Sequence, residues 1–115
     1  MEVTQMQTNG VEIVAISGHI VGSENASRAF HELFQSLIGD GKKKFLVDLE
    51  ETPWTNSLGI GMLMGAYASV KRNGGEVVLA NPTERIRDLL AVTKLTLVFK
   101  VFDSRQAAIE HLTKV

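Results

Sequence analysis

Residues 44–79 constrain the fold of this chain most strongly, because they read as strand, loop, helix and strand in direct succession. The run 45–49 is apolar except for Asp48 and alternates little, which is typical of a central strand. A seven-residue loop follows, and the helix that we expect to begin at Ser57 carries apolar side chains at helical spacing. An Asn-Gly-Gly sequence at 73–75 predicts the end of that helix before a strand at 77–80. The segment therefore predicts a sheet with a helix packed against it.

The rest of the chain continues this alternation of strand and helix patterns. An Asn-Gly dipeptide at 9–10 predicts a hairpin that pairs a strand near 3–7 with a strand at 11–17, and a last strand is predicted at 98–102. Three residues are suited to cap further helices: Ser23, Thr83 and Ser104. The order of elements predicts an α/β fold, with a central mixed sheet and about four helices packed on it. No linker or repeat divides the chain, so we expect residues 1–115 to form one domain.

Composition and charge exclude several classes of function. The net charge is −1 and no basic block occurs, so nucleic acid and anionic membranes are poor partners. The chain has no cysteine, and its three histidines lack the spacing of metal ligands. No apolar run approaches the roughly 20 residues that span a bilayer, and the first residues do not resemble a signal peptide. We therefore expect a cytoplasmic protein with no membrane span, metal or cofactor.

No set of residues assembles an active site, so we do not expect an enzyme. The adjacent carboxylates Glu50 and Glu51 are interpreted as a solvated loop pair. Gly59, Gly61 and Gly65 lack the G-x-G-x-x-G spacing, so a nucleotide-binding function is supported only weakly. Each glycine costs a helix about 1 kcal/mol relative to alanine. Close helix packing is the leading explanation for Gly61 and Gly65, and a partner that approaches the backbone is the other.

The predicted helix from Ser57 carries more apolar surface than one core-facing stripe requires. Five side chains form that stripe: Ile60, Leu63, Met64, Tyr67 and Val70. Leu58 and Met62 fall on the opposite side of a helical wheel, where we expect them to be at least partly exposed and to form a docking patch. Ser57 itself is interpreted as the helix cap, and a phosphate on it would add charge beside the patch. Trp54 could be a core residue, a loop anchor or part of the docking surface.

Three segments together resemble the STAS domain, and in particular the bacterial anti-sigma factor antagonists. They are Asp-Leu at 48–49, Trp-Thr-Asn-Ser-Leu-Gly-Ile-Gly at 54–61, and Lys-Arg-Asn-Gly-Gly-Glu-Val-Val-Leu at 71–79. The resemblance extends over residues 11–112 and implies the STAS fold. The pattern of alternating strands and helices leads to the same fold independently.

The most specific part of the resemblance is the loop and helix start, where the family reads Asp-Ser-(Ser, Thr or Ala)-Gly-Leu-Gly. Ser57 falls on the family's phosphorylated serine, Asn56 on its aspartate, and Gly59 and Gly61 on its glycines. The family docks its partner around this helix start. The expected partner-binding residues are Asn56, Ser57, Leu58, Gly59 and Met62.

The resemblance implies a switch in transcription regulation. The unphosphorylated chain would capture an anti-sigma factor with serine kinase activity and free the sigma factor. The kinase would then phosphorylate Ser57, and a serine phosphatase would reverse the modification. Val21 and Asn56 depart from the family because each replaces an acid near the phosphorylation site. The alternative is a STAS interaction module of another assembly, such as a stress-sensing scaffold or a lipid-transport complex, in which Ser57 is a plain cap.

Overall fold

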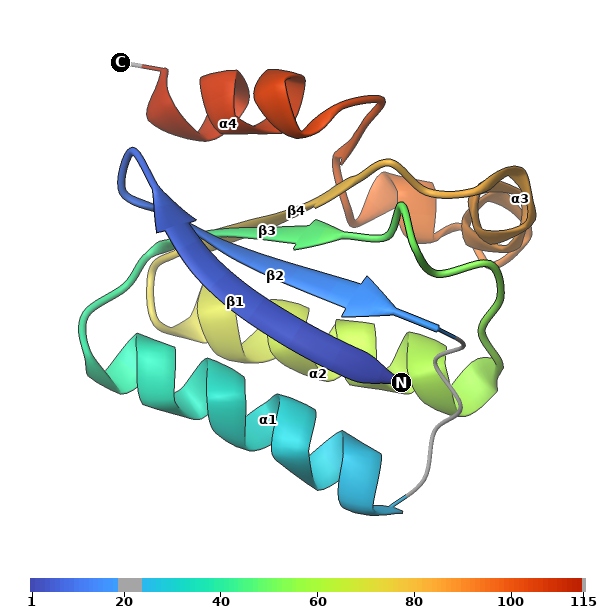
Figure 1. Ribbon diagram of the computed structural model, residues 1–115, viewed down its shortest axis with the longest axis horizontal. Coiled ribbons are helices and arrows are strands. Elements are labelled where there is room, and N and C mark those ends of the chain that lie inside the picture. Colours follow the sequence, from blue (N-terminus) through green and yellow to red (C-terminus); the bar gives the residue numbers. More distant parts are fainter. Residues whose placement is uncertain (19–23, 115) are drawn as a thin grey trace.

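The computed structural model describes residues 1–18 and 24–114, which form a mixed sheet with helices on both faces (Figure 1). The strands are β1 (Glu2–Thr8), β2 (Val11–Ser17), β3 (Lys44–Asp48), β4 (Glu76–Ala80) and β5 (Val101–Phe102). The helices are α1 (Glu24–Gly39), α2 (Ser57–Arg72), α3 (Glu84–Val92) and α4 (Arg105–Thr113), with a 3₁₀ turn, η1, at Leu95–Leu97. The predicted α/β class and mixed sheet are confirmed.

The strands lie in the sheet in the order in which they occur in the chain. β1 and β2 form the predicted antiparallel hairpin, and the later pairs are parallel. Asn9 and Gly10 turn the hairpin with φ of 53° and 79°, a region that asparagine and glycine adopt more readily than other residues. The parallel order means that the loops after β2, β3 and β4 leave from the same end of the sheet.

Helices α1 and α2 cover one face of the sheet and α4 covers the other (Figure 1). The face under α1 and α2 holds the larger core, in which Phe34 stacks on Phe45 with ring centroids 5.2 Å apart. The face under α4 holds a smaller core that includes Leu46, Val78 and Ala108. β3 is therefore buried on both sides, as its apolar run predicts.

Two predicted helix caps are confirmed, and the last strand is shorter than predicted. Thr83 and Ser104 accept hydrogen bonds from backbone N–H groups of the first turns of α3 and α4, whereas Ser23 lies outside the described residues. The predicted strand at 98–102 pairs only at Val101–Phe102. Val98 and Phe99 instead donate their backbone N–H groups to the Leu95 carbonyl and so close the turn η1, and the Phe99 side chain is 2% exposed in the core.

Candidate functional site at the start of helix α2

The loop between β3 and α2 is anchored at its beginning by Asp48, whose side chain is only 3% exposed. One carboxylate oxygen accepts hydrogen bonds from the Glu50 backbone N–H (3.0 Å) and the Asn81 side-chain amide (3.3 Å). The other oxygen pairs with Nε of Arg105 at 2.8 Å. Because both oxygens are satisfied, Asp48 fixes the direction in which the chain leaves the strand.

Further along, the loop is attached to β2 and α3. The buried Thr52 hydroxyl donates to the Ile16 carbonyl at 2.7 Å. Trp54 is half-buried and lines a hollow beside α3 together with Leu89 and Val92. Ser57 therefore follows directly after a loop that Asp48 and Thr52 hold in place.

The residue that caps α2 is Asn56, so the interpretation of Ser57 as the cap is wrong. Asn56 has an extended backbone, and its side-chain oxygen accepts from the Gly59 N–H at 2.9 Å. Asparagine and serine are about equally favoured at this position, and the sequence places one directly after the other. Ser57 is then the first residue of the helix and is exposed. Its hydroxyl is not used for capping.

Leu58 is exposed as predicted, but the predicted exposure of Met62 is wrong. Leu58 is 60% exposed and Met62 only 8%. The helical wheel assigned the side away from the Ile60–Val70 stripe to solvent, whereas α1 lies beside α2 on the same face of the sheet and covers part of that side (Figure 1). A hydrogen bond of 3.0 Å from the Gln35 amide to the buried Ser69 hydroxyl joins the same two helices. Met62 therefore belongs to the core.

A groove of about 350 Å³ runs between α1 and α2 and begins at Ser57. Its other lining residues are Ser27, Phe30, His31, Leu58, Gly61, Met62, Gly65 and Ala66. Gly61 and Gly65 are exposed, and beyond the adjoining residues and the nearby backbone of α2 no described atom lies within 4 Å of the position where a Cβ would be. Close packing within the chain, the leading explanation for these two glycines, is therefore wrong. Their missing side chains leave the groove open.

The wall of the groove that α1 supplies was not foreseen from the sequence. Two of its residues, Phe30 and His31, belong to α1, a separate helix. Only the pairing of α1 with α2 brings them beside Leu58. An amphipathic pattern indicates which side of a helix is apolar, but it does not indicate which other helix lies beside it.

The electrostatics of this site favour an anion near Ser57. The N–H groups of a first helical turn lack helical partners, and the helix dipole adds partial positive charge there. The first turn of α2 contains no acidic residue, and no Asp, Glu, Lys or Arg lines the groove. Asn56 provides the cap without a charge. Val21, the other departure from the family pattern, lies outside the described residues.

Residues 1–18 and 24–114 contain no group of three or more His, Asp or Glu side chains that could hold a metal ion. Within the same residues, no helix is both long and apolar enough to cross a bilayer. Glu50 and Glu51 are both exposed, as predicted.

Comparison with known proteins agrees with this geometry. A protein of Thermotoga neapolitana named as an anti-sigma factor antagonist is 28% identical over 89 residues, which cover 77% of this chain and 79% of the relative. A crystal structure from Thermotoga maritima, of a protein also named as an anti-sigma factor antagonist, matches with a TM-score of 0.88 at 19% identity over 97% of this chain and 95% of its own.

The fold also matches SpoIIAA, an anti-sigma factor antagonist, in its unphosphorylated form, with a TM-score of 0.74 at 15% identity over 99% of this chain and 100% of that chain. It matches part of the murine anion transporter Slc26a9 as well, with a TM-score of 0.74 over 96% of this chain and 19% of the transporter. The model of the STAS domain family matches residues 3–108. The chain therefore belongs to the STAS domain family.

Proposed function

We propose that this chain is an anti-sigma factor antagonist that captures an anti-sigma factor with serine kinase activity. The observation that carries the proposal is the exposed Ser57, which is free of the capping role and lies beside the exposed Leu58. The names of the relatives support the same function. Capture would free a sigma factor and so regulate transcription in the cytoplasm.

Capture would use Leu58 and the open groove behind it. Burying an exposed leucine side chain is worth about 1.5–3 kcal/mol. Gly61 and Gly65 leave space for a side chain of the partner to lie against the backbone of α2. Because no carboxylate, ammonium or guanidinium group lines this groove, desolvating it on binding is inexpensive. The surface suits an apolar segment of a protein.

Phosphorylation of Ser57 would reverse capture without unfolding the chain. The helix N-terminus stabilises a phosphate by about 0.3–1 kcal/mol, so the fold tolerates it. The phosphate adds about 1.5–2 negative charges beside Leu58. Burying that charge against a partner costs several kcal/mol unless the partner supplies cations. A serine phosphatase would restore the capturing form.

The neutral Asn56 modifies this switch. It retains the capping hydrogen bond, because an amide oxygen accepts as a carboxylate oxygen does. It does not supply the negative charge that the family pattern offers to a kinase. We expect an Asn56→Asp variant to be phosphorylated faster than the natural chain, and equal rates would show that this charge is unimportant.

The direct test is phosphorylation by the cognate anti-sigma factor kinase. The chain is incubated with that kinase and ATP, and the modified residue is mapped by mass spectrometry. We expect one phosphate on Ser57, none on Ser57→Ala, and full modification of Ser36→Ala, a control at an exposed serine of α1. Phosphate on Thr52 or Thr55, or none on either protein, would contradict the proposal.

The second candidate is an interaction module in another assembly that does not depend on phosphorylation. Two observations favour it: the neutral Asn56, and the occurrence of the fold within an anion transporter. The same groove would then bind a different partner, and Ser57 would be an unmodified surface residue. Tight capture of a partner, with an affinity that does not change when Ser57 is phosphorylated, would support this candidate.

A further inference from the structure

Strand β1 forms one edge of the sheet and has β2 as its neighbour on one side (Figure 1). All seven of its residues pair with β2 in one continuous register, from Glu2 with Ser17 to Thr8 with Val11. A strand at an edge directs the N–H and C=O groups of alternate residues away from its neighbour. Within residues 1–18 and 24–114, no backbone hydrogen bond satisfies these outward groups. β1 therefore presents a row of donors and acceptors that another strand could use.

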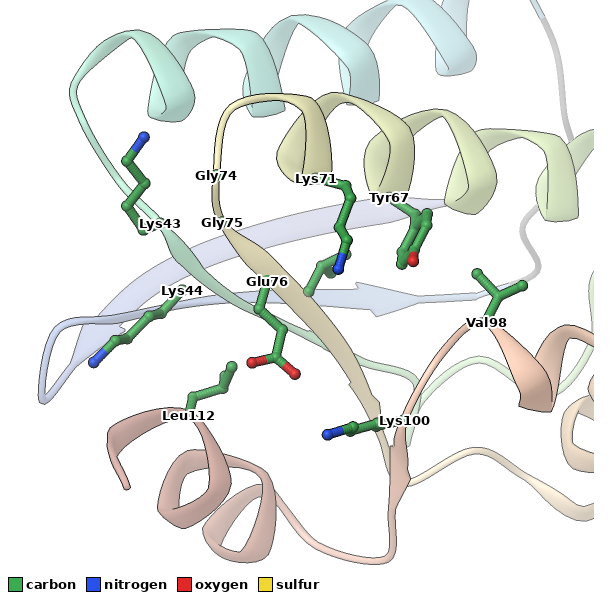
Figure 2. Close-up of a pocket in the computed structure, with 11 residues that line it drawn as sticks. Lys43, Lys44, Tyr67, Lys71, Gly74, Gly75, Glu76, Val98, Lys100 and Leu112 are labelled. Atoms are coloured by element: carbon green, nitrogen blue, oxygen red, sulfur yellow. The ribbon is translucent and has the colours of Figure 1, made fainter. Parts of the chain in front are cut away.

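The opposite edge of the sheet is protected against such pairing. β5 has only two residues, and it covers Leu79 and Ala80 of β4. The uncovered start of β4, at Glu76 and Val77, borders a hollow of about 490 Å³. Four lysines line this hollow: Lys43, Lys44, Lys71 and Lys100 (Figure 2). A short edge strand and lysine side chains both hinder the pairing of one sheet with another.

β1 has neither form of protection. Its sequence, Glu-Val-Thr-Gln-Met-Gln-Thr, contains no lysine, arginine or proline, and its register with β2 has no bulge. Six of its seven side chains are exposed, including Met6 at 52%. The Gln5 amide donates to the Glu12 carboxylate at 2.9 Å on one face, and the Arg105 guanidinium donates to the Met6 sulfur at 3.5 Å on the other. The edge is therefore long, regular and accessible.

This strand is complementary to a second copy of itself. If two β1 strands pair antiparallel about a two-fold axis at Gln5, all seven residues of each strand take part. Gln5 then opposes itself, and the other opposed residues are Glu2 with Thr8, Val3 with Gln7, and Thr4 with Met6. Glu2 is the only charged residue of the strand, so no two like charges face each other.

A second copy also costs less to bind than a disordered segment of another protein. Its β1 strand is already extended and paired with β2, so little conformational entropy is lost when two copies meet. Pairing through one strand makes a small interface, which is typical of weak and reversible association.

We propose that β1 joins two copies of this chain into a symmetric dimer with one continuous sheet. The dimer forms reversibly and uses the outward backbone groups of both β1 strands. No residue of β1 lines the groove at Ser57, so the dimer does not depend on the function proposed for that site.

The test is sedimentation velocity of the whole chain from micromolar to millimolar concentration. We expect the average mass to rise from that of the monomer towards that of the dimer. Thr4→Lys/Met6→Lys and Thr4→Glu/Met6→Glu each place four like charges around the two-fold axis, so each variant alone should remain monomeric. The control Val92→Lys/Thr96→Lys changes exposed residues of α3 and η1 and should associate as the natural chain does. Melting curves establish that each variant is folded.

The register is tested by mixing the two charged variants of β1. Each introduced lysine then faces an introduced glutamate, so the mixture should associate at least tenfold more tightly than either variant alone. Position 8 tests the end of the same register, because Thr8 opposes Glu2 of the other copy. Thr8→Lys should strengthen the dimer, and Thr8→Glu should weaken it.

Four results would overturn the proposal. The first is a natural chain that stays monomeric at millimolar concentration. The second is association that persists in both charged variants of β1, or that the control loses equally, because the contact would then lie elsewhere. The third is a mixture of the two folded variants that does not associate. The fourth is a monomeric chain whose β1 amide NMR signals shift when the anti-sigma factor is added, which would make this edge a docking strand for that partner.

Discussion

The two ends of helix α2 differ sharply, although they belong to one continuous helix. At the start, an uncharged groove with exposed glycines lies beside the exposed Leu58. At the end, four lysines line a larger hollow (Figure 2). The difference arises from the residues of α2 at each end and from the elements that lie beside them. α1 forms the wall of the groove, whereas the shortened β5 and α4 form that of the hollow.

The middle of α2 keeps these two ends in a fixed relation. Leu63, Ala66 and Val70 are buried in the larger core, and Ser69 is bonded to α1. Because protein interiors are closely packed, a helix that is buried on two sides stays rigid, and its two ends keep a fixed separation. The following substitutions therefore act on one end at a time, and a variant that affected both ends equally would contradict the separation.

The largest effect on stability is expected from Met62, because this residue lies in the core at the groove floor. Met62→Ala should lower the free energy of unfolding by about 2–5 kcal/mol. Leu58→Ala, four residues earlier on the same helix, should change it by less than about 0.5 kcal/mol. Urea denaturation of both variants measures the difference. Equal losses would mean that Leu58 is also packed.

Among the substitutions, the largest effect on partner capture at constant stability is expected from Leu58→Lys. A lysine at this exposed position should weaken capture of the anti-sigma factor at least about tenfold, or about 1.4 kcal/mol. The Lys71→Gln/Lys100→Gln variant, which changes the other end of α2, should capture the partner normally. Surface plasmon resonance on the two variants compares the two ends directly. An equal loss of capture in both variants would show that the ends are coupled.

The cap of α2 provides a smaller effect of about 1 kcal/mol. Asn56→Ala removes the acceptor for the Gly59 N–H and should destabilise the chain by about that amount. Ser57→Ala should change the unfolding free energy by less than about 0.5 kcal/mol, because Ser57 is not the cap. Thermal melts of both variants test the assignment. A larger loss of stability in Ser57→Ala than in Asn56→Ala would mean that Ser57 is the cap.

The smallest effect is a gain in stability at Gly65. Gly65→Ala should stabilise the helix by up to about 1 kcal/mol, because its added methyl group meets open space. The same methyl group narrows the groove, so capture of the partner should weaken. Gly75→Ala is the contrasting variant: its Cβ would lie 2.6 Å from the Lys43 carbonyl oxygen and should destabilise the chain. Improved stability with unchanged capture in Gly65→Ala would remove the groove from the binding surface.

Most strands of the sheet and the hairpin could be predicted from the sequence, because apolar runs and hairpin or cap residues are local signals. The sequence was also sufficient to locate Ser57 at the start of a helix. The prediction for Met62 was wrong because a helical wheel treats one helix in isolation. It cannot show that α1 lies beside α2 and that Met62 is buried between them. The cap was misplaced because Asn56 and Ser57 are both good capping residues. The basic hollow was not predicted, because it depends on β5 being shorter than the strand predicted at 98–102.

The most direct test of the central claim is the affinity of the anti-sigma factor kinase for the chain with and without phosphate on Ser57. Both forms are prepared from one sample, and their melting temperatures are compared at the same time. We expect the phosphorylated form to bind at least about 100-fold more weakly, about 2.7 kcal/mol, with a nearly unchanged melting temperature. Equal affinities of the two forms would contradict the claim that the start of α2 is a phosphorylation-controlled docking surface.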